Sequence, residues 1–182
     1  MMLSEVKAYT SPKHQILEDE GLGLFLKSGS FSKAHYSAWL NLMLCLMLKY
    51  RESAIYDDLR IINDAEYDKA YAALVKDLHN QVVTVPETPP DSYKPTKEEM
   101  MAVQYLLLGS SMGAKMIMVG VHRHEQSTRD KFLKVMTSWA PLFMAFQKMM
   151  EQHEAKLNTP AFLKATDALF DMLIQIQREV LA

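Results

Sequence analysis

Cysteine is nearly absent from this sequence, since Cys45 is the only one among 182 residues. One thiol cannot form an internal disulfide or supply a cysteine metal site, so we expect a protein of the reducing cytoplasm. We interpret Cys45 itself as a small buried hydrophobe. An excess of basic residues is also lacking, because the formal net charge is −2 and no basic run occurs. This balance argues against a nucleic-acid partner.

Long uninterrupted hydrophobic runs are missing as well. The window 39–48 is too short to span a bilayer, and the window 100–121 contains Gln104 and Lys115. Residues 1–15 are too polar for a signal peptide. We therefore expect no membrane span, and we interpret both apolar windows as buried helices of a soluble protein.

Glycine and proline number only 6 and 7, and they collect at a few breaks between long helical stretches. No stretch shows the sustained alternation of apolar and polar residues that marks a strand, and no internal repeat is present. With 49% apolar and 23% charged residues, the composition is that of a globular protein. The sequence therefore predicts one all-α domain over residues 1–182, a bundle of roughly six or seven helices.

Helix-start residues place the predicted elements along the chain. Ser11 and Pro12 suit the start of the first helix, and Thr96 with Glu99 forms a capping box at the start of a later one. Prolines within 82–96 predict a linker. The other predicted features are an interruption over 20–30 and helices over 31–50, 64–80, Thr96 to His124, Ser127 to Gln152, and from a cap at Thr159 and Pro160 onward.

The apolar segment LLLGSSMGAKMI, residues 106–117, contains two glycines where a helix would be more stable with alanine. Gly109 and Gly113 are about one helical turn apart, so they share a face. This spacing permits two explanations: another helix packs closely there, or a flat ligand lies against the bare backbone. The 14 methionines likewise suit either an adaptable core or a large apolar cofactor cavity.

His14 is the histidine whose surroundings suggest a ligand, because Glu18 lies one turn later on the same helix face. A metal-bound imidazole needs an acceptor for its second ring N–H, and a carboxylate at this spacing supplies one. The alternative is an ordinary solvated helical pair. His122 and His124 point to different sides of a helix, so we interpret them as a polar helix end.

Together these segments resemble the two heme-contacting segments of heme oxygenases. Four residues near the N-terminus stand at the spacing of the family's proximal motif: Lys7, Thr10, His14 and Glu18. The run YLLLGSSMGA, residues 105–114, is similar to the distal motif of bacterial members. Three of its residues are in register with that motif: Gly109, Ser110 and Gly113. Chain length and the proline-rich linker also suit the bacteriophytochrome-associated type of the family.

The resemblance implies an all-α, heme oxygenase-like bundle with heme between the first helix and a distal helix kinked at its glycines. It implies that His14 is the axial ligand of the iron and that Lys7 pairs with a propionate. Gly109, Ser110 and Gly113 would be the catalytic residues, the glycines admitting dioxygen and the serine holding water that delivers protons. The remaining residues that it places at the heme are Thr10, Glu18, Ser111, Met112 and Ala114.

The implied reaction is the O₂-dependent cleavage of heme, at once substrate and cofactor, to biliverdin, carbon monoxide and iron. Electrons would come from a donor of the ferredoxin or flavin reductase type, and the protein would be a monomer or a homodimer. The sequence departs from the family pattern at several positions: Ser11, Pro12, Leu108 and Ala114. The basic partner of the second propionate stays open among Arg129, Lys131, Lys134 and Lys148.

Two other function classes remain as alternatives. A non-catalytic protein of the same fold could bind heme or another flat ligand, and the departures from the family pattern favour it. Di-iron oxidases and thiamin-type hydrolases require clustered carboxylates and histidines, or a cysteine nucleophile, inside the bundle. Cys45 has no obvious catalytic partner in the sequence and no second Glu-x-x-His pair occurs, so this class is the least favoured.

Overall fold

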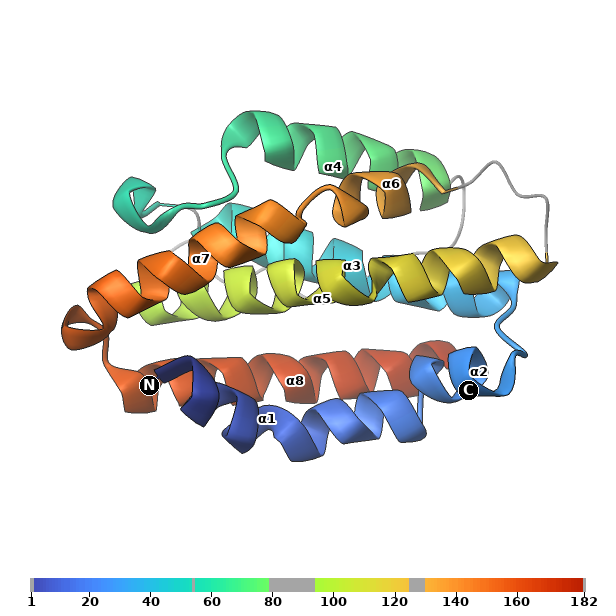
Figure 1. The fold of residues 1–182 in the computed structure, drawn as a ribbon, viewed down its shortest axis with the longest axis horizontal. Helices are drawn as coiled ribbons and strands as arrows, with labels where there is room; N and C mark the ends of the chain where they lie inside the picture. Colours follow the sequence, from blue (N-terminus) through green and yellow to red (C-terminus); the bar gives the residue numbers. More distant parts are fainter. Residues whose placement is uncertain (1, 54, 79–93, 125–129, 182) are drawn as a thin grey trace.

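The computed structural model describes residues 2–53, 55–78, 94–124 and 130–181. Within these residues every regular element is a helix and no strand occurs, which confirms the predicted all-α class (Figure 1). The helices are α1 (Met2–Asp19), α2 (Leu22–Ser28), α3 (Lys33–Ser53), α4 (Asp64–Leu78), α5 (Lys97–His124), α6 (Lys131–Thr137), α7 (Ala140–His153) and α8 (Thr159–Leu181), with short 3₁₀ turns at Asp57–Leu59 and Glu154–Lys156.

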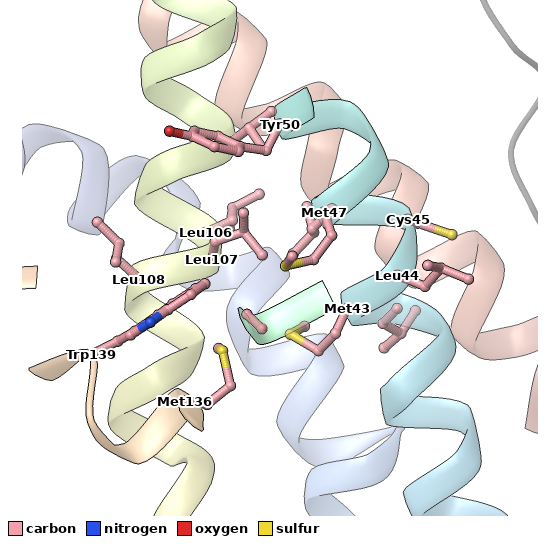
Figure 2. Packing of buried hydrophobic residues seen from close by; sticks show 14 of the residues in the cluster. Met43, Leu44, Cys45, Met47, Tyr50, Leu106, Leu107, Leu108, Met136 and Trp139 are labelled. Carbon is pink, nitrogen blue, oxygen red and sulfur yellow. The ribbon is translucent and has the colours of Figure 1, made fainter. Parts of the chain in front are cut away.

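Helix α5 is the centre of the bundle, because it packs against α3, α6, α7 and α8 and also meets α2. The core between α3 and α5 contains Met43, Met47 and Tyr50 from α3 and Leu107 from α5, with Trp139 beside them (Figure 2). Most of the described methionines on these helices are therefore core residues, as an adaptable core would have. Cys45 is fully buried on the other side of α3, and burial raises the pKa of its thiol to about 11 (Figure 2).

A buried polar side chain of α5 forms hydrogen bonds with the segment that precedes α4. Gln104 of α5 is fully buried; its Oε1 accepts a hydrogen bond from the backbone N–H of Ile61 at 2.8 Å, and its Nε2 donates to the carbonyl of Leu59 at 3.0 Å. One side chain in the apolar window 100–121 thus satisfies two backbone groups of the segment before α4. Unpaired, such groups would destabilise the fold.

The start of α1 differs from the prediction. The helix begins at Met2, so Ser11 is not its N-cap and Pro12 lies inside it. Proline cannot donate the backbone hydrogen bond and costs about 3 kcal/mol in a helix interior. Burial of Val6 and Thr10, together with the packing of α1 along α8, supplies the tertiary support that extends the helix past this cost.

The predicted helix from Ser127 to Gln152 is also wrong. The chain forms α6 and α7 instead, with a break at Ser138 and Trp139 just before Pro141, which stands in the first turn of α7. A proline suits the first turn of a helix and has no backbone N–H to donate to the carbonyl four residues earlier, that of Thr137, so the break before α7 follows from Pro141. Ser127 lies outside the described residues, as do 82–93 of the predicted linker.

Capping was predicted correctly at α5. The backbone N–H of Thr96 donates to Glu99 Oε2 at 2.6 Å, and the N–H of Glu99 donates to Thr96 Oγ1 at 3.2 Å. At α8 the cap lies one residue earlier than Thr159, because Asn158 Oδ1 accepts from the N–H of Ala161 at 3.1 Å. The predicted interruption at 20–30 contains the short helix α2.

Among the described residues, one helix is long and apolar enough to cross a membrane by length and composition, and it is α5. Half of its apolar window is buried inside the bundle. The core helix of a soluble protein meets the same criteria, so this feature is weak support for a membrane span.

We predict that Gln104→Leu lowers the free energy of unfolding by about 1–3 kcal/mol, because it leaves the backbone groups of Leu59 and Ile61 without their partner. Chemical denaturation measures this. The matched control is Gln175→Leu on the exposed side of α8, where the side chain bonds only to Glu179, and it should change stability by less than about 0.5 kcal/mol. Equal effects of the two substitutions would contradict the role given to Gln104.

Candidate functional site

Three helices that run in the same direction frame the candidate site: α1, α5 and α8 (Figure 1). Both α1 and α5 pack along α8. Tyr105 of α5 marks a common level, because its ring meets the edge of Phe162 in α8 with centroids 6.4 Å apart. A side-chain hydrogen bond also links Tyr105 to Thr10 of α1, and it partly offsets the burial that raises the pKa of Tyr105. At this level α1 and α5 are in direct contact.

About two turns further along α8 lies Phe170, whose buried ring meets the ring of His14 edge-on with centroids 6.2 Å apart. Two turns beyond Tyr105 on α5 lies Gly113. These steps on α8 and α5 each span roughly 12 Å at 1.5 Å per residue, whereas His14 follows Thr10 by only about 6 Å along α1. His14 therefore lies at the level of α5 between Gly109 and Gly113.

The imidazole of His14 has a carboxylate near one of its two nitrogens and is largely exposed to solvent. Its Nδ1 lies 3.2 Å from Glu18 Oε1, and the side chain is 61% exposed. Lys27 also reaches this carboxylate, with Nζ 3.4 Å from Oε2, so Glu18 is held from two directions. No described residue bonds to Nε2 of His14. Nδ1 of His14 thus has a carboxylate oxygen within ion-pair distance, and Nε2 has no partner among the described residues.

One face of α5 is buried by neighbouring helices near Tyr105 and becomes exposed to solvent further along the helix. Tyr105, Gly109, Met112 and Met116 follow one another at spacings of three or four residues, so they lie along one stripe. At Tyr105 this stripe is covered by α1, by Phe162 of α8 and by Phe146 of α7. Further on, Met112 is 60% and Met116 65% exposed. We call the stretch of α5 from Gly109 to Met116 on this side the open face.

Neither glycine of the open face is required for packing within the described part of the chain. A Cβ built on Gly109 or Gly113 would meet no atom within 4 Å. Close helix–helix packing, one of the two explanations for their spacing, therefore has no partner there. The helix α5 passes through both glycines without a break.

Gly120 is the glycine of α5 at which another segment packs closely, and the open face ends there. A Cβ at this position would lie 2.8 Å from Leu26 Cδ2 and 3.3 Å from Phe31 Cδ1, because α2 and the segment after it cross α5 here. The open face thus lies between two covered levels, Tyr105 and Gly120, which are roughly 22 Å apart along the helix. The sequence analysis missed Gly120, since its need for a small side chain depends on residues remote in sequence.

The serines of the distal segment bond back to their own helix. Ser110 Oγ donates to the carbonyl of Leu106 at 2.8 Å, and Ser111 Oγ donates to that of Leu108. Both oxygens can still accept a hydrogen bond, but their hydrogens are engaged. Ser110 is partly exposed, whereas Ser111 and Ala114 are buried. The structure therefore does not bring Ser111 and Ala114 to the open face.

On α1 the predicted residues divide in the same way. Lys7 is exposed and shares a helix flank with His14 and Glu18. Thr10 is buried, and its Oγ1 donates to the carbonyl of Val6 at 2.8 Å, so its role is structural. Two of the four predicted propionate partners, Lys131 and Lys148, are exposed; Lys134 pairs with Asp130 at 2.8 Å, and Arg129 lies outside the described residues.

Lys13 was not predicted, yet it orients α1. Its Nζ lies 2.7 Å from both Asp167 Oδ1 and Asp171 Oδ1 on α8. Burial lowers the pKa of Lys13, but the two carboxylates outweigh that effect and the pKa is raised. Lys7, His14 and Glu18 lie on the adjoining flank of α1, where the ring of His14 still meets Phe170 of α8. The contacts of Lys13 with α8 could not be read from the sequence of α1.

The chain matches no protein-family model, no curated protein and no solved structure. In the described residues no group of three or more His, Cys, Asp or Glu side chains is placed to hold a metal ion. A cavity of about 270 Å³ between α3, α5 and α8 is lined by Val103 and Leu169 and contains no residue of the open face. The open face with His14 is therefore the candidate functional site.

We predict that Gly109→Ala and Gly113→Ala each raise the free energy of unfolding by about 0.5–1 kcal/mol, because alanine is the better helix former and nothing contacts its methyl group. Thermal or chemical denaturation measures this. Gly120→Ala is the control and should show no such gain, since its methyl group would press on Leu26. A loss of stability at Gly113→Ala would mean that another part of the chain fills the open face.

Proposed function

We propose that the protein is a heme oxygenase that holds heme between α1 and the open face of α5, with His14 as the axial ligand. The observation that carries this proposal is the imidazole of His14, which has Nδ1 beside the Glu18 carboxylate, Nε2 unpaired among the described residues, and a level between those of Gly109 and Gly113. The likeness of both segments to the family's motifs supports it.

The residues fit the group in two respects. A lone histidine suits a metal whose other ligands come from a macrocycle, and proximal histidines of this kind are common in heme proteins. The space beside Gly109 and Gly113 is unfilled by described residues, and two exposed apolar side chains lie on the same face of α5: Met112 and Met116. A flat apolar ring would bury surface that these two side chains now leave to water.

When bound, heme supplies a redox-active iron that uses O₂ and the ring that is oxidised to biliverdin, carbon monoxide and iron. In this proposal Glu18 fixes the ring orientation of His14 and Lys7 pairs with a propionate. Gly109 and Gly113 leave the α5 side free of side chains. Ser110 Oγ, whose hydrogen is engaged, accepts a hydrogen bond from water and so leaves that water's other proton to donate.

The first test is binding. We predict that the protein binds one equivalent of hemin with a strong Soret band and that His14→Ala abolishes the axial-ligand signature. Glu18→Ala should weaken hemin affinity by about 10-fold, since it removes only the orienting acceptor. The control is His153→Ala, because His153 lies at the end of α7 and bonds to the Met149 carbonyl. A hemin spectrum unchanged from that in buffer would end the heme proposal.

The second test separates catalysis from binding. With a ferredoxin or flavin reductase-type donor and O₂, the hemin complex should lose its Soret band and yield a bilin. The second candidate function is a non-catalytic heme-binding protein, favoured by one observation: the hydroxyl hydrogens of Ser110 and Ser111 point to the backbone of α5. A hemin complex that survives reductant in air would support that function instead.

A further inference from the structure

The cavity between α3, α5 and α8 lies at the end of the bundle where α3 ends and α5 begins. Helix α3 runs opposite to α5 and α8, so its last turn lies beside the first turns of α5 (Figure 1). The volume of the cavity is about 270 Å³. Pockets for drug-sized ligands usually span about 300–1,000 Å³, so this cavity suits a somewhat smaller molecule.

Apolar side chains form the α8 side of the cavity. The four α8 residues in the lining are all apolar, and their spacing places them on one side of the helix: Ala165, Ala168, Leu169 and Met172. Val103 of α5 adds a buried apolar side chain. An apolar body that enters the cavity therefore removes hydrocarbon surface from water, which favours binding.

On the α3 side the lining is charged. Lys49 Nζ lies 4.0 Å from Glu52 Oε2, and about a third of each side chain is exposed. Neither side chain forms a hydrogen bond with another described residue. An ion pair this long is weak, so a charged group of a ligand can replace either partner at little cost.

The charges of the lining favour a cationic ligand. Glu99 is the third charged residue there, so two carboxylates accompany one ammonium group. Glu99 accepts a hydrogen bond from the N–H of Thr96 in the first turn of α5, where the helix dipole favours an anion. Glu52 lies in the last turn of α3, where the dipole disfavours an anion. Glu52 is therefore the carboxylate that gains most from a further cation.

We infer that this cavity binds a small amphipathic amine, whose ammonium group pairs with Glu52 and whose apolar body lies against Val103 and Leu169. A ligand with a carboxylate would find Lys49, but it would also be repelled by Glu52 and Glu99. Helix periodicity places Glu99 and Val103 on the side of α5 opposite the open face. The inference therefore goes beyond the proposed function and does not depend on it.

The test measures the binding of 2-phenylethylamine to the full chain without hemin, by calorimetry and ligand-observed NMR at neutral pH. 2-Phenylethanol is the neutral probe of nearly the same shape, and phenylacetate is the anionic probe. We expect the amine to bind about 10-fold more tightly than the alcohol, because its hydrogen bond to Glu52 joins two charged groups. Phenylacetate should bind more weakly than the alcohol.

Two substitutions separate the effect of charge from that of space. Glu52→Gln should remove the preference for the amine and leave the affinity for the alcohol unchanged. Its control is Glu151→Gln, which lies in the last turn of α7 and should change neither affinity. Ala168→Leu should abolish binding of both probes, because the larger side chain fills the cavity. Its control is Ala72→Leu on the exposed side of α4.

The other outcomes contradict the inference in different ways. Equal affinities for the amine and the alcohol, or a preference for the amine that survives Glu52→Gln, would remove the role of Glu52. Tighter binding of phenylacetate would reverse the charge of the ligand. No binding of either probe, or binding that survives Ala168→Leu, would remove the cavity as the site. None of these results bears on hemin, so they leave the test of the proposed function separate.

Discussion

The shared support of α1 and α5 by α8 is the constraint on which the candidate site depends. Lys13 joins α1 to two carboxylates of α8, and Phe162 of α8 packs against Tyr105 of α5. Because each helix is tied to α8, the positions of His14 on α1 and of Gly113 on α5 are set by helix packing. A ligand that bound between the two helices would meet residues already in place, which lowers the entropic cost of binding.

Three glycines of α5 show how differently the same residue type acts on one helix. Gly120 admits Leu26 and lets α2 cross closely, so its cost in helix stability is offset by packing. Gly109 and Gly113 cost about 1 kcal/mol each and gain no contact within the described residues. Two neighbouring glycines that lower helix stability and make no packing contact in exchange are typical of a functional surface. The imidazole of His14, at the level of these two glycines, supplies a group there that can bind a metal.

Local signals in the sequence predicted what depends on neighbouring residues. The capping box of Thr96 and Glu99, the length of α5 and the burial of Cys45 all follow from spacing and composition. Tertiary packing decided the rest. Contacts with α8 carry α1 through Pro12, and the cover that α1, α7 and α8 place over Tyr105 determines where the open face begins. Residues remote in sequence supply those contacts, so the pattern within one segment does not contain them.

The two candidate functions differ mainly in what occupies the space beside Gly113. Ser110 donates its hydroxyl hydrogen to the backbone of α5, so it can only accept from a water molecule there. A water held in that way keeps a proton to donate, which suits catalysis provided that no side chain fills the same space. Nothing among the described residues fills the space beside Gly113, where a Cβ would meet no atom within 4 Å. Whether a bound ligand leaves room for such a water in that space is therefore what separates the catalytic candidate from the binding candidate.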